Sequence, residues 1–176
     1  MEEEKVNQMP RIGDMAPDFK ANTTHGPIQF SEFIKDNWVI LFSHPADFTP
    51  VCTTEMSGFA LRSDEFDALN TKLIGLSIDS IHSHIAWVNN VKKNTGVLFN
   101  FPIIADIDMK VSKIYGMLQP NESETAAVRA VFFIDPVGKI RLMMYYPLNV
   151  GRNMDEIMRS LIALQTSDKH GVAMPL

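Results

Sequence analysis

Apolar residues occur in this chain both as short continuous runs and at helical spacing, and the two patterns alternate along the sequence. Continuous apolar runs are typical of strands that are covered on both faces. They predict strands at Trp38–Phe42, Lys72–Asp79, Phe101–Ala105, Val128–Ile134 and Ile140–Tyr146, with a shorter one at Pro27–Phe30. Helical spacing predicts helices at Thr53–Leu69, Ser80–Lys93, Asp108–Tyr115 and Asn153–Thr166, and a single helical turn at Ser31–Lys35.

Capping and turn residues indicate where several of these elements begin or end. Ser31 and Ser80 are candidate helix N-caps, and Gly116 is of the type that commonly follows a helix. The segment Asp135–Lys139 contains a proline and a glycine, which predicts a hairpin between the last two strands. The remaining polar or glycine- and proline-rich segments are expected to be loops or tails: residues 1–10, 13–19, 118–127 and 167–176.

Strands and helices alternate throughout, which favours an α/β sheet with helices on both faces. The chain has 176 residues, of which 45% are hydrophobic. That length and composition are sufficient for one globular domain with a substantial core. We therefore expect a single domain over residues 1–176.

Charge and the chain start exclude some classes of partner and location. The formal net charge is -5, and lysine and arginine form no long runs, so nucleic acid or an anionic membrane is not an expected partner. No apolar run approaches the length of a membrane span, and the start Met-Glu-Glu-Glu-Lys lacks a signal-peptide apolar region. A single cysteine cannot form an internal disulfide. Together these features predict a cytoplasmic location.

The only cysteine, Cys52, lies where the strand Trp38–Phe42 gives way to a helix. Unpaired backbone N–H groups and the helix dipole favour an anion at such a position, and the thiolate is the nucleophilic form of cysteine. Pro45 and Pro50 stiffen the approach, and Thr49 can place a hydroxyl beside the sulfur. The alternative is a small buried cysteine that packs in the core without reacting.

Residues 43–55 read Ser-His-Pro-Ala-Asp-Phe-Thr-Pro-Val-Cys-Thr-Thr-Glu. The Pro, Thr and Cys at positions 45, 49 and 52 resemble the peroxidatic motif of the peroxiredoxins. The whole stretch is similar to their one-cysteine, peroxiredoxin-6-like branch, including its bacterial and archaeal members, and the similarity extends from Gly13 to Ile157. This resemblance implies a thioredoxin fold of the peroxiredoxin type, a central mixed sheet flanked by helices, and no cofactor.

The resemblance also implies a thiol-dependent peroxidase that reduces hydrogen peroxide and organic hydroperoxides. The Cys52 thiolate would attack one peroxide oxygen while the other leaves as water or an alcohol. Thr49 and Arg129 would hold the two oxygens and stabilise the developing charge. The product is a sulfenic acid at Cys52. Because the chain has no second cysteine, an external thiol or a thioredoxin- or glutaredoxin-like reductant would resolve it.

Four polar residues, Arg129 among them, are candidates for the same site on their own chemistry. Arg129 lies in an apolar strand, where a buried guanidinium needs an anion such as a thiolate, unless its head reaches solvent. Glu55 follows Cys52 by one helical turn and could hold Arg129, or it is an ordinary glutamate favoured by the helix dipole. Arg152 resembles a second arginine of the family's network, the alternative being a capping or surface charge. In the resembling branch the histidine at the position of His44 lies near the sulfur, the alternative being a packed histidine.

The other histidines, His25, His82, His84 and His170, show no metal-ligand spacing, so we expect no metal. The resemblance implies a homodimer that can assemble further into a decamer. Two other functions on this fold stay open: a peroxide sensor or relay that passes its oxidation to a partner, and an oligomeric chaperone that needs no Cys52. A thiol–disulfide oxidoreductase is disfavoured because Cys-x-x-Cys is absent.

The chain departs from the branch pattern in two places. Members of the branch usually continue beyond the segment that corresponds to residues 172–176, and archaeal members often carry extra cysteines there. We therefore expect this C-terminal extension to be missing or shortened. Some animal members have a phospholipase site of the type Gly-Asp-Ser-Trp-Gly, but residues 35–39 here read Lys-Asp-Asn-Trp-Val. The serine is replaced by asparagine, so lipase activity is not expected.

Overall fold

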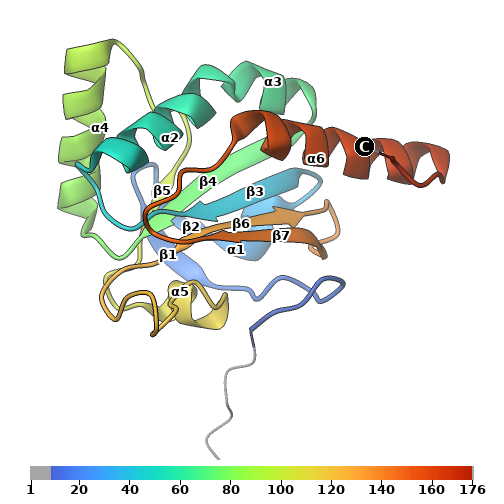
Figure 1. Ribbon diagram of the computed structural model, residues 1–176, viewed down its shortest axis with the longest axis horizontal. Coiled ribbons are helices and arrows are strands. Elements are labelled where there is room, and N and C mark those ends of the chain that lie inside the picture. Colours follow the sequence, from blue (N-terminus) through green and yellow to red (C-terminus); the bar gives the residue numbers. More distant parts are fainter. Residues whose placement is uncertain (1–8, 176) are drawn as a thin grey trace, which may run out of the picture.

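A seven-stranded mixed sheet forms the centre of the computed structural model, which describes residues 9–175 (Figure 1). The strands lie in the order β2-β1-β5-β4-β3-β6-β7. In chain order they are β1 (Lys20–Thr23), β2 (Gly26–Gln29), β3 (Trp38–Ser43), β4 (Thr71–Ser77), β5 (Ile103–Ala105), β6 (Arg129–Ile134) and β7 (Ile140–Tyr146). β3, β4 and β5 run parallel, and the other neighbouring strands are antiparallel.

Helices cover both faces of the sheet, as the alternating pattern predicts. They are α1 (Phe30–Ile34), α2 (Pro50–Leu61), α3 (Ser63–Ala68), α4 (Ile81–Thr95), α5 (Lys110–Ile114) and α6 (Met154–His170). One core lies between the sheet and α2, α3, α4 and α6, and a second lies on the opposite face with α1 and α5 (Figure 1). Within residues 9–175, no helix is long and apolar enough to cross a membrane.

The central strand β3 supplies side chains to both cores. Ile40 and Phe42 pack in the core beneath α2, α4 and α6, whereas Val39 and Leu41 pack in the core on the opposite face. This alternation follows from the two-residue period of a strand, and all six residues of β3 are buried. The strand ends at Ser43, and the turn that follows it leads into α2.

Several predicted boundaries are confirmed by the hydrogen bonds that form there. The Ser80 hydroxyl caps α4 by accepting from the Ser83 backbone N–H over 3.2 Å. Asn153 caps α6 by accepting from two backbone N–H groups. α4 ends at Thr95, and the capping residue that follows, Gly96, has a φ of 76° that suits glycine. β6 and β7 form the expected antiparallel hairpin.

The helix predicted at Thr53–Leu69 is two helices, and it starts earlier than predicted. α2 begins at Pro50, which lacks the N–H that a first-turn residue leaves unpaired in any case. The chain then turns at Arg62, whose backbone N–H bonds to the Phe59 carbonyl over 3.3 Å in a tight turn. α3 follows and keeps Phe66 buried.

Two predictions near the N-terminus and one near the C-terminus were also wrong. Ser31 does not cap α1; instead its backbone N–H donates to the Asp18 carboxylate over 2.8 Å, so the cap comes from outside the helix. β1 was missed because Lys20–Thr23 is polar, and its strand geometry comes from pairing with β2 and β5. α6 continues beyond the predicted end and stops only before Gly171, which has a φ of 65°.

Candidate active site

Cys52 is the third residue of α2, and its side chain is fully buried. Thr49 is the extended residue before the helix, and Pro50 is the first helical residue. The backbone N–H of a third helical residue has no partner within the helix. The first turn also carries the positive end of the helix dipole. The fold therefore places the sulfur where an anion is stabilised.

Arg129, the first residue of β6, donates a hydrogen bond from Nη1 to the Cys52 sulfur over 3.3 Å. β6 pairs antiparallel with β3, so the start of β6 lies beside the end of β3, where the chain turns toward Cys52. The Nε and Nη2 atoms of Arg129 both donate to the Leu148 carbonyl, over 2.9 and 2.8 Å. These bonds fix the plane of the guanidinium, and the residue is only 3% exposed.

Glu55 holds two arginines at once. Its Oε2 accepts from Arg129 Nη1 over 2.6 Å and from Arg152 Nη2 over 3.0 Å. Its Oε1 accepts from the backbone N–H and the Nε of Arg152, over 2.6 and 2.8 Å. Burial opposes ionisation of Glu55, but Arg152, and then Arg129, outweigh it and hold the pKa of Glu55 below its usual value. Two guanidinium charges and one carboxylate leave one positive charge, which a Cys52 thiolate would balance.

Arg152 joins the ends of two strands beneath this site. Its Nη1 donates to the Ser43 carbonyl over 2.8 Å and to the Ala130 carbonyl over 2.9 Å. Its guanidinium also lies over the rings of Phe42 and Phe59, at 5.6 and 5.8 Å from their centroids. Such contacts favour a cation. Arg152 is therefore a buried structural partner of Glu55 rather than a surface charge.

Thr49 and Pro45 lie in the turn between β3 and α2, and both are half-buried. The Thr49 hydroxyl donates to the Ala46 carbonyl over 3.0 Å. The Thr49 carbonyl accepts from both the backbone N–H and the hydroxyl of Thr53, over 3.0 and 2.8 Å. Thr49 thus fixes the start of α2 and holds its hydroxyl three residues before Cys52.

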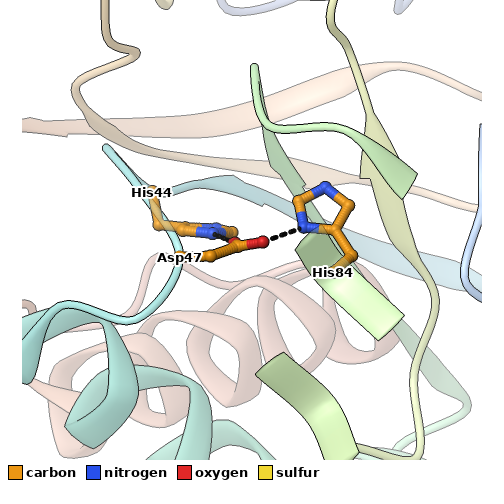
Figure 2. Close-up of side chains that lie close together, drawn as sticks. All are labelled: His44, Asp47 and His84. Atoms are coloured by element: carbon orange, nitrogen blue, oxygen red, sulfur yellow. Dashed lines mark hydrogen bonds and ion pairs between the residues drawn. The ribbon is translucent and has the colours of Figure 1, made fainter. Parts of the chain in front are cut away.

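His44 belongs to a second buried group that the sequence reasoning did not find. Figure 2 shows the Asp47 carboxylate between the rings of His44 and His84. His44 Nε2 lies 2.8 Å from Asp47 Oδ1, and His84 Nδ1 lies 2.7 Å from Asp47 Oδ2. The sequence spacing of the histidines gave no sign that His84 lies beside Asp47 and His44. One signal for its burial was available: His84 precedes Trp87 and Val91 at helical spacing, and all three are buried on α4.

The three residues of this group offer potential metal-ligand atoms within 4.8 Å of one another. However, the carboxylate lies between the two rings, and each ring nitrogen faces its own carboxylate oxygen (Figure 2). Hydrogen bonds at 2.7–2.8 Å place a proton between each pair of atoms. The arrangement is that of a hydrogen-bonded charged group.

The fold and the site together define a class: an oxidoreductase with a buried cysteine at a helix start, paired with an arginine. Residues 12–143 match the AhpC/TSA family. The chain therefore belongs to the AhpC/TSA family, and it has the thioredoxin fold and the thiol-dependent peroxidase activity of the peroxiredoxins. Its single cysteine fits resolution by an external thiol.

Individual relatives agree over most of the chain. A peroxiredoxin of Aquifex aeolicus is 55% identical over 97% of this chain and 77% of its own length. A solved structure of a yeast mitochondrial 1-Cys peroxiredoxin has a TM-score of 0.89 and 47% identity, covering 96% of this chain and 82% of that one. Peroxiredoxin 6 of Arenicola marina, solved as a cysteine-to-serine mutant, has a TM-score of 0.89 and 37% identity, covering 94% of this chain and 78% of that one.

Proposed function

We propose that Cys52 is the peroxidatic nucleophile and that Thr49, Arg129 and Pro45 form its immediate site. The Cys52 thiolate attacks the nearer oxygen of a hydroperoxide, so an S–O bond forms and the O–O bond breaks. The far oxygen leaves with the bonding electron pair and takes up a proton, giving water or an alcohol. Cys52 is left as a sulfenic acid. Thr49 and Arg129 bind the two oxygens and stabilise the charge on the leaving one.

The hydrogen bond from Arg129 to the buried sulfur is the observation that carries this proposal. A buried guanidinium beside a thiol favours the thiolate. The same guanidinium is held by Glu55 and by the Leu148 carbonyl, so it need not reorganise when charge develops. Glu55, Arg152 and His44 act as supporting residues.

Rapid mixing of the reduced protein with hydrogen peroxide tests the role of Cys52. Trp87 is a suitable reporter because its Nε1 donates to the Thr53 hydroxyl, next to Cys52, over 3.3 Å. We expect a Trp87 fluorescence change that is orders of magnitude faster than the reaction of free cysteine and is absent in Cys52→Ser. Trp38→Phe, at the far end of β3, should keep the signal, and Trp87→Phe should lose most of it. A rate no faster than that of free cysteine would overturn the proposal.

We infer that glutathione, with a glutaredoxin-like partner, or a thioredoxin-like protein reduces the sulfenic acid. The solved yeast mitochondrial relative is described as resolving its thiol through glutathione and thioredoxin systems. Steady-state peroxide consumption with each reductant tests the inference. Turnover with one of them supports it. Fast oxidation of Cys52 without turnover in any would instead favour a peroxide sensor or relay.

We propose that the chain forms a homodimer through β7. This strand is an outer strand of the sheet, so one of its edges has no partner strand within residues 9–175. All but the first of its residues are only half-buried, although most of them are large and apolar. Sedimentation should give a dimer, and Met143→Glu on β7 should weaken it. Val137→Glu, at an exposed turn position, is the control for the added negative charge. A monomer at micromolar concentration would contradict the proposal. Assembly into a decamer, the cytoplasmic location and the single-domain extent stay predictions.

A further inference from the structure

His44, Asp47 and His84 form a buried group outside the contacts of Cys52 with Arg129. The two histidines are fully buried and Asp47 is 7% exposed. They come from the turn before α2 and from the first turn of α4 (Figure 2). Three buried titratable side chains at one point are costly unless their charges and hydrogen bonds are matched. The protonation of each ring can be worked out from its partners.

His84 has an oxygen acceptor at each of its ring nitrogens. Nδ1 faces the Asp47 carboxylate at 2.7 Å, and Nε2 faces the Ile104 carbonyl at 3.0 Å. A backbone carbonyl carries no proton, so Nε2 must donate. A carboxylate is likewise an acceptor, so Nδ1 also donates. The ring therefore satisfies both bonds only as an imidazolium, whose charge would balance the Asp47 carboxylate.

Asp47 is the anion at the centre of the group. Its Oδ2 accepts from the Ser83 hydroxyl over 2.8 Å as well as from His84. Burial opposes its ionisation, yet the hydrogen bonds from His44 and His84 outweigh it and hold the pKa of Asp47 far below its usual range. Its backbone N–H also donates to Asp79 Oδ2 over 3.1 Å. Asp47 thus ties the turn before α2 to the chain that follows β4 and to the start of α4.

His44 is left with one bare nitrogen. Because Asp47 can only accept, His44 Nε2 carries the proton of their 2.8 Å bond. Burial lowers the pKa of His44 and outweighs the hydrogen bond and charge of Asp47, so the ring stays neutral and Nδ1 is a lone-pair acceptor. Nδ1 is buried and has no hydrogen-bond partner within the described part of the chain. The ring lies against Trp87, with centroids 5.1 Å apart.

The group also restrains the turn that carries the peroxidatic motif. Phe48, next to Asp47, has a left-handed φ of 60° and is 54% exposed, a conformation that a bulky residue adopts at a cost. The anchored Asp47 lies on one side of it, and Thr49, which begins α2, lies on the other. Loss of the anchor would free the turn that precedes Cys52.

We propose that Asp47 and His84 are positioning residues of the peroxidase reaction: His84 holds Asp47, and Asp47 holds His44 with Nδ1 free to accept a hydrogen bond from a hydroperoxide O–H. This inference rests on the proposed role of Cys52. Neither Asp47 nor His84 needs to touch the peroxide. Each acts by fixing the ring of His44 and the turn that leads into α2.

Nitrogen NMR of the ¹⁵N-histidine-labelled wild-type protein tests the protonation states without any substitution. At pH 7 we expect His84 to have two protonated ring nitrogens, and His44 to have a protonated Nε2 and a bare Nδ1. The ring-nitrogen signals that disappear from the spectrum of His84→Gln are assigned to His84. A neutral His84, or a proton on His44 Nδ1, would overturn the inference. A merely structural role of His84 would not require this pattern.

Rapid mixing with hydrogen peroxide gives the functional arm of the test. Asp47→Asn and His84→Gln should each slow oxidation of Cys52 by about tenfold to a hundredfold, as for outer partners that orient a ligating histidine. Ser83→Ala, which removes one donor to Asp47, is a milder variant with a smaller expected loss. The exposed neighbour His82 provides the matched control, and His82→Gln should react like wild type. A fast wild type with equally fast Asp47 and His84 variants would overturn this inference alone. A slow wild type would overturn the proposed role of Cys52.

Discussion

Arg129 donates to the Cys52 sulfur from the same nitrogen that it uses to bind Glu55. Nη1 lies 3.3 Å from Cys52 Sγ and 2.6 Å from Glu55 Oε2. A guanidinium Nη1 carries two hydrogens, so each acceptor receives one. Glu55 therefore sets the direction of the hydrogen that points at the sulfur. The negative charge of Glu55, which alone would oppose a thiolate, is compensated by Arg129 and Arg152.

Arg129→Lys should lower the rate constant of Cys52 oxidation by hydrogen peroxide by about 10²–10³, the usual effect of removing a preorganised donor from a developing charge. Lysine keeps the charge, but its single ammonium cannot reach Cys52, Glu55 and the Leu148 carbonyl together. Rapid mixing measures the rate. Arg141→Lys on β7, whose arginine pairs with Asp168 over 2.7 Å, is the control. A loss of less than threefold in Arg129→Lys would contradict the role of the guanidinium.

Glu55→Gln should remove a pH-dependent part of the stability. The pKa of Glu55 is lowered in the folded protein from an ordinary value of 4.5, so its contribution is fully present above that value. It is lost as pH falls through the lower folded pKa. The unfolding free energies of wild type and Glu55→Gln should therefore differ most near pH 7 and converge below about pH 4.5. Denaturant unfolding at matched protein concentration measures both. A difference that stays constant with pH would contradict the lowered pKa.

A helix or strand could be predicted from the sequence where its own residues match the burial and the hydrogen bonds that the element has in the structure. β3 is a continuous apolar run and is covered on both faces, and Ser80 caps α4 as its residue type suggests. The polar strand β1 could not be predicted, because its hydrogen bonds come from β2 and β5. The start of α1 likewise depends on Asp18, a cap supplied by another segment.

The site could be predicted where residue type and position are unusual together. Cys52 at a helix start and Arg129 in an apolar strand are both unusual, and the structure brings them together. Asp47 and His84 are 37 residues apart. Nothing local links them, since their contact arises from the way α4 packs beside the turn before α2. The spacing of residues along the sequence does not show which common residues far apart in the chain will come into contact.

Thr49→Val should slow the reaction with hydrogen peroxide, while Thr49→Ser should retain most of the rate. Valine keeps the shape of threonine but removes the hydroxyl that donates to the Ala46 carbonyl. A missing hydroxyl removes a hydrogen-bonding group for the peroxide, which costs about 10²–10³ where it contacts developing charge. The rate constant should therefore fall in Thr49→Val and recover in Thr49→Ser. Equal rates in the two variants would contradict a role of the Thr49 hydroxyl in the reaction.

Arg152→Met should destabilise the fold more than it impairs the chemistry. Arg152 is buried, and it pairs with Glu55 and with the carbonyls of Ser43 and Ala130. Methionine has a similar length but leaves the two carbonyls without this donor and leaves Arg129 as the only guanidinium that pairs with Glu55. Breaking a buried ion pair in this way costs about 3–5 kcal/mol, whereas the contact of Arg129 with Cys52 is retained. Urea unfolding should show this loss, and the rate of Cys52 oxidation should fall less than in Arg129→Lys.

The matched control for Arg152 is Arg159 on the surface of α6, which pairs with Glu156 over 2.7 Å and is half exposed. Exposed pairs of this kind contribute about 0–1 kcal/mol, so Arg159→Met should leave the unfolding free energy almost unchanged. The comparison separates the loss of a charge from the loss of a buried network. If both variants lost the same unfolding free energy, the buried hydrogen bonds of Arg152 would contribute no more to stability than a surface ion pair does. Arg152→Met could instead lose several kcal/mol of unfolding free energy but keep a measurable reaction with peroxide. The two arginines would then have different roles: Arg152 stabilises the site, and Arg129 acts on the sulfur.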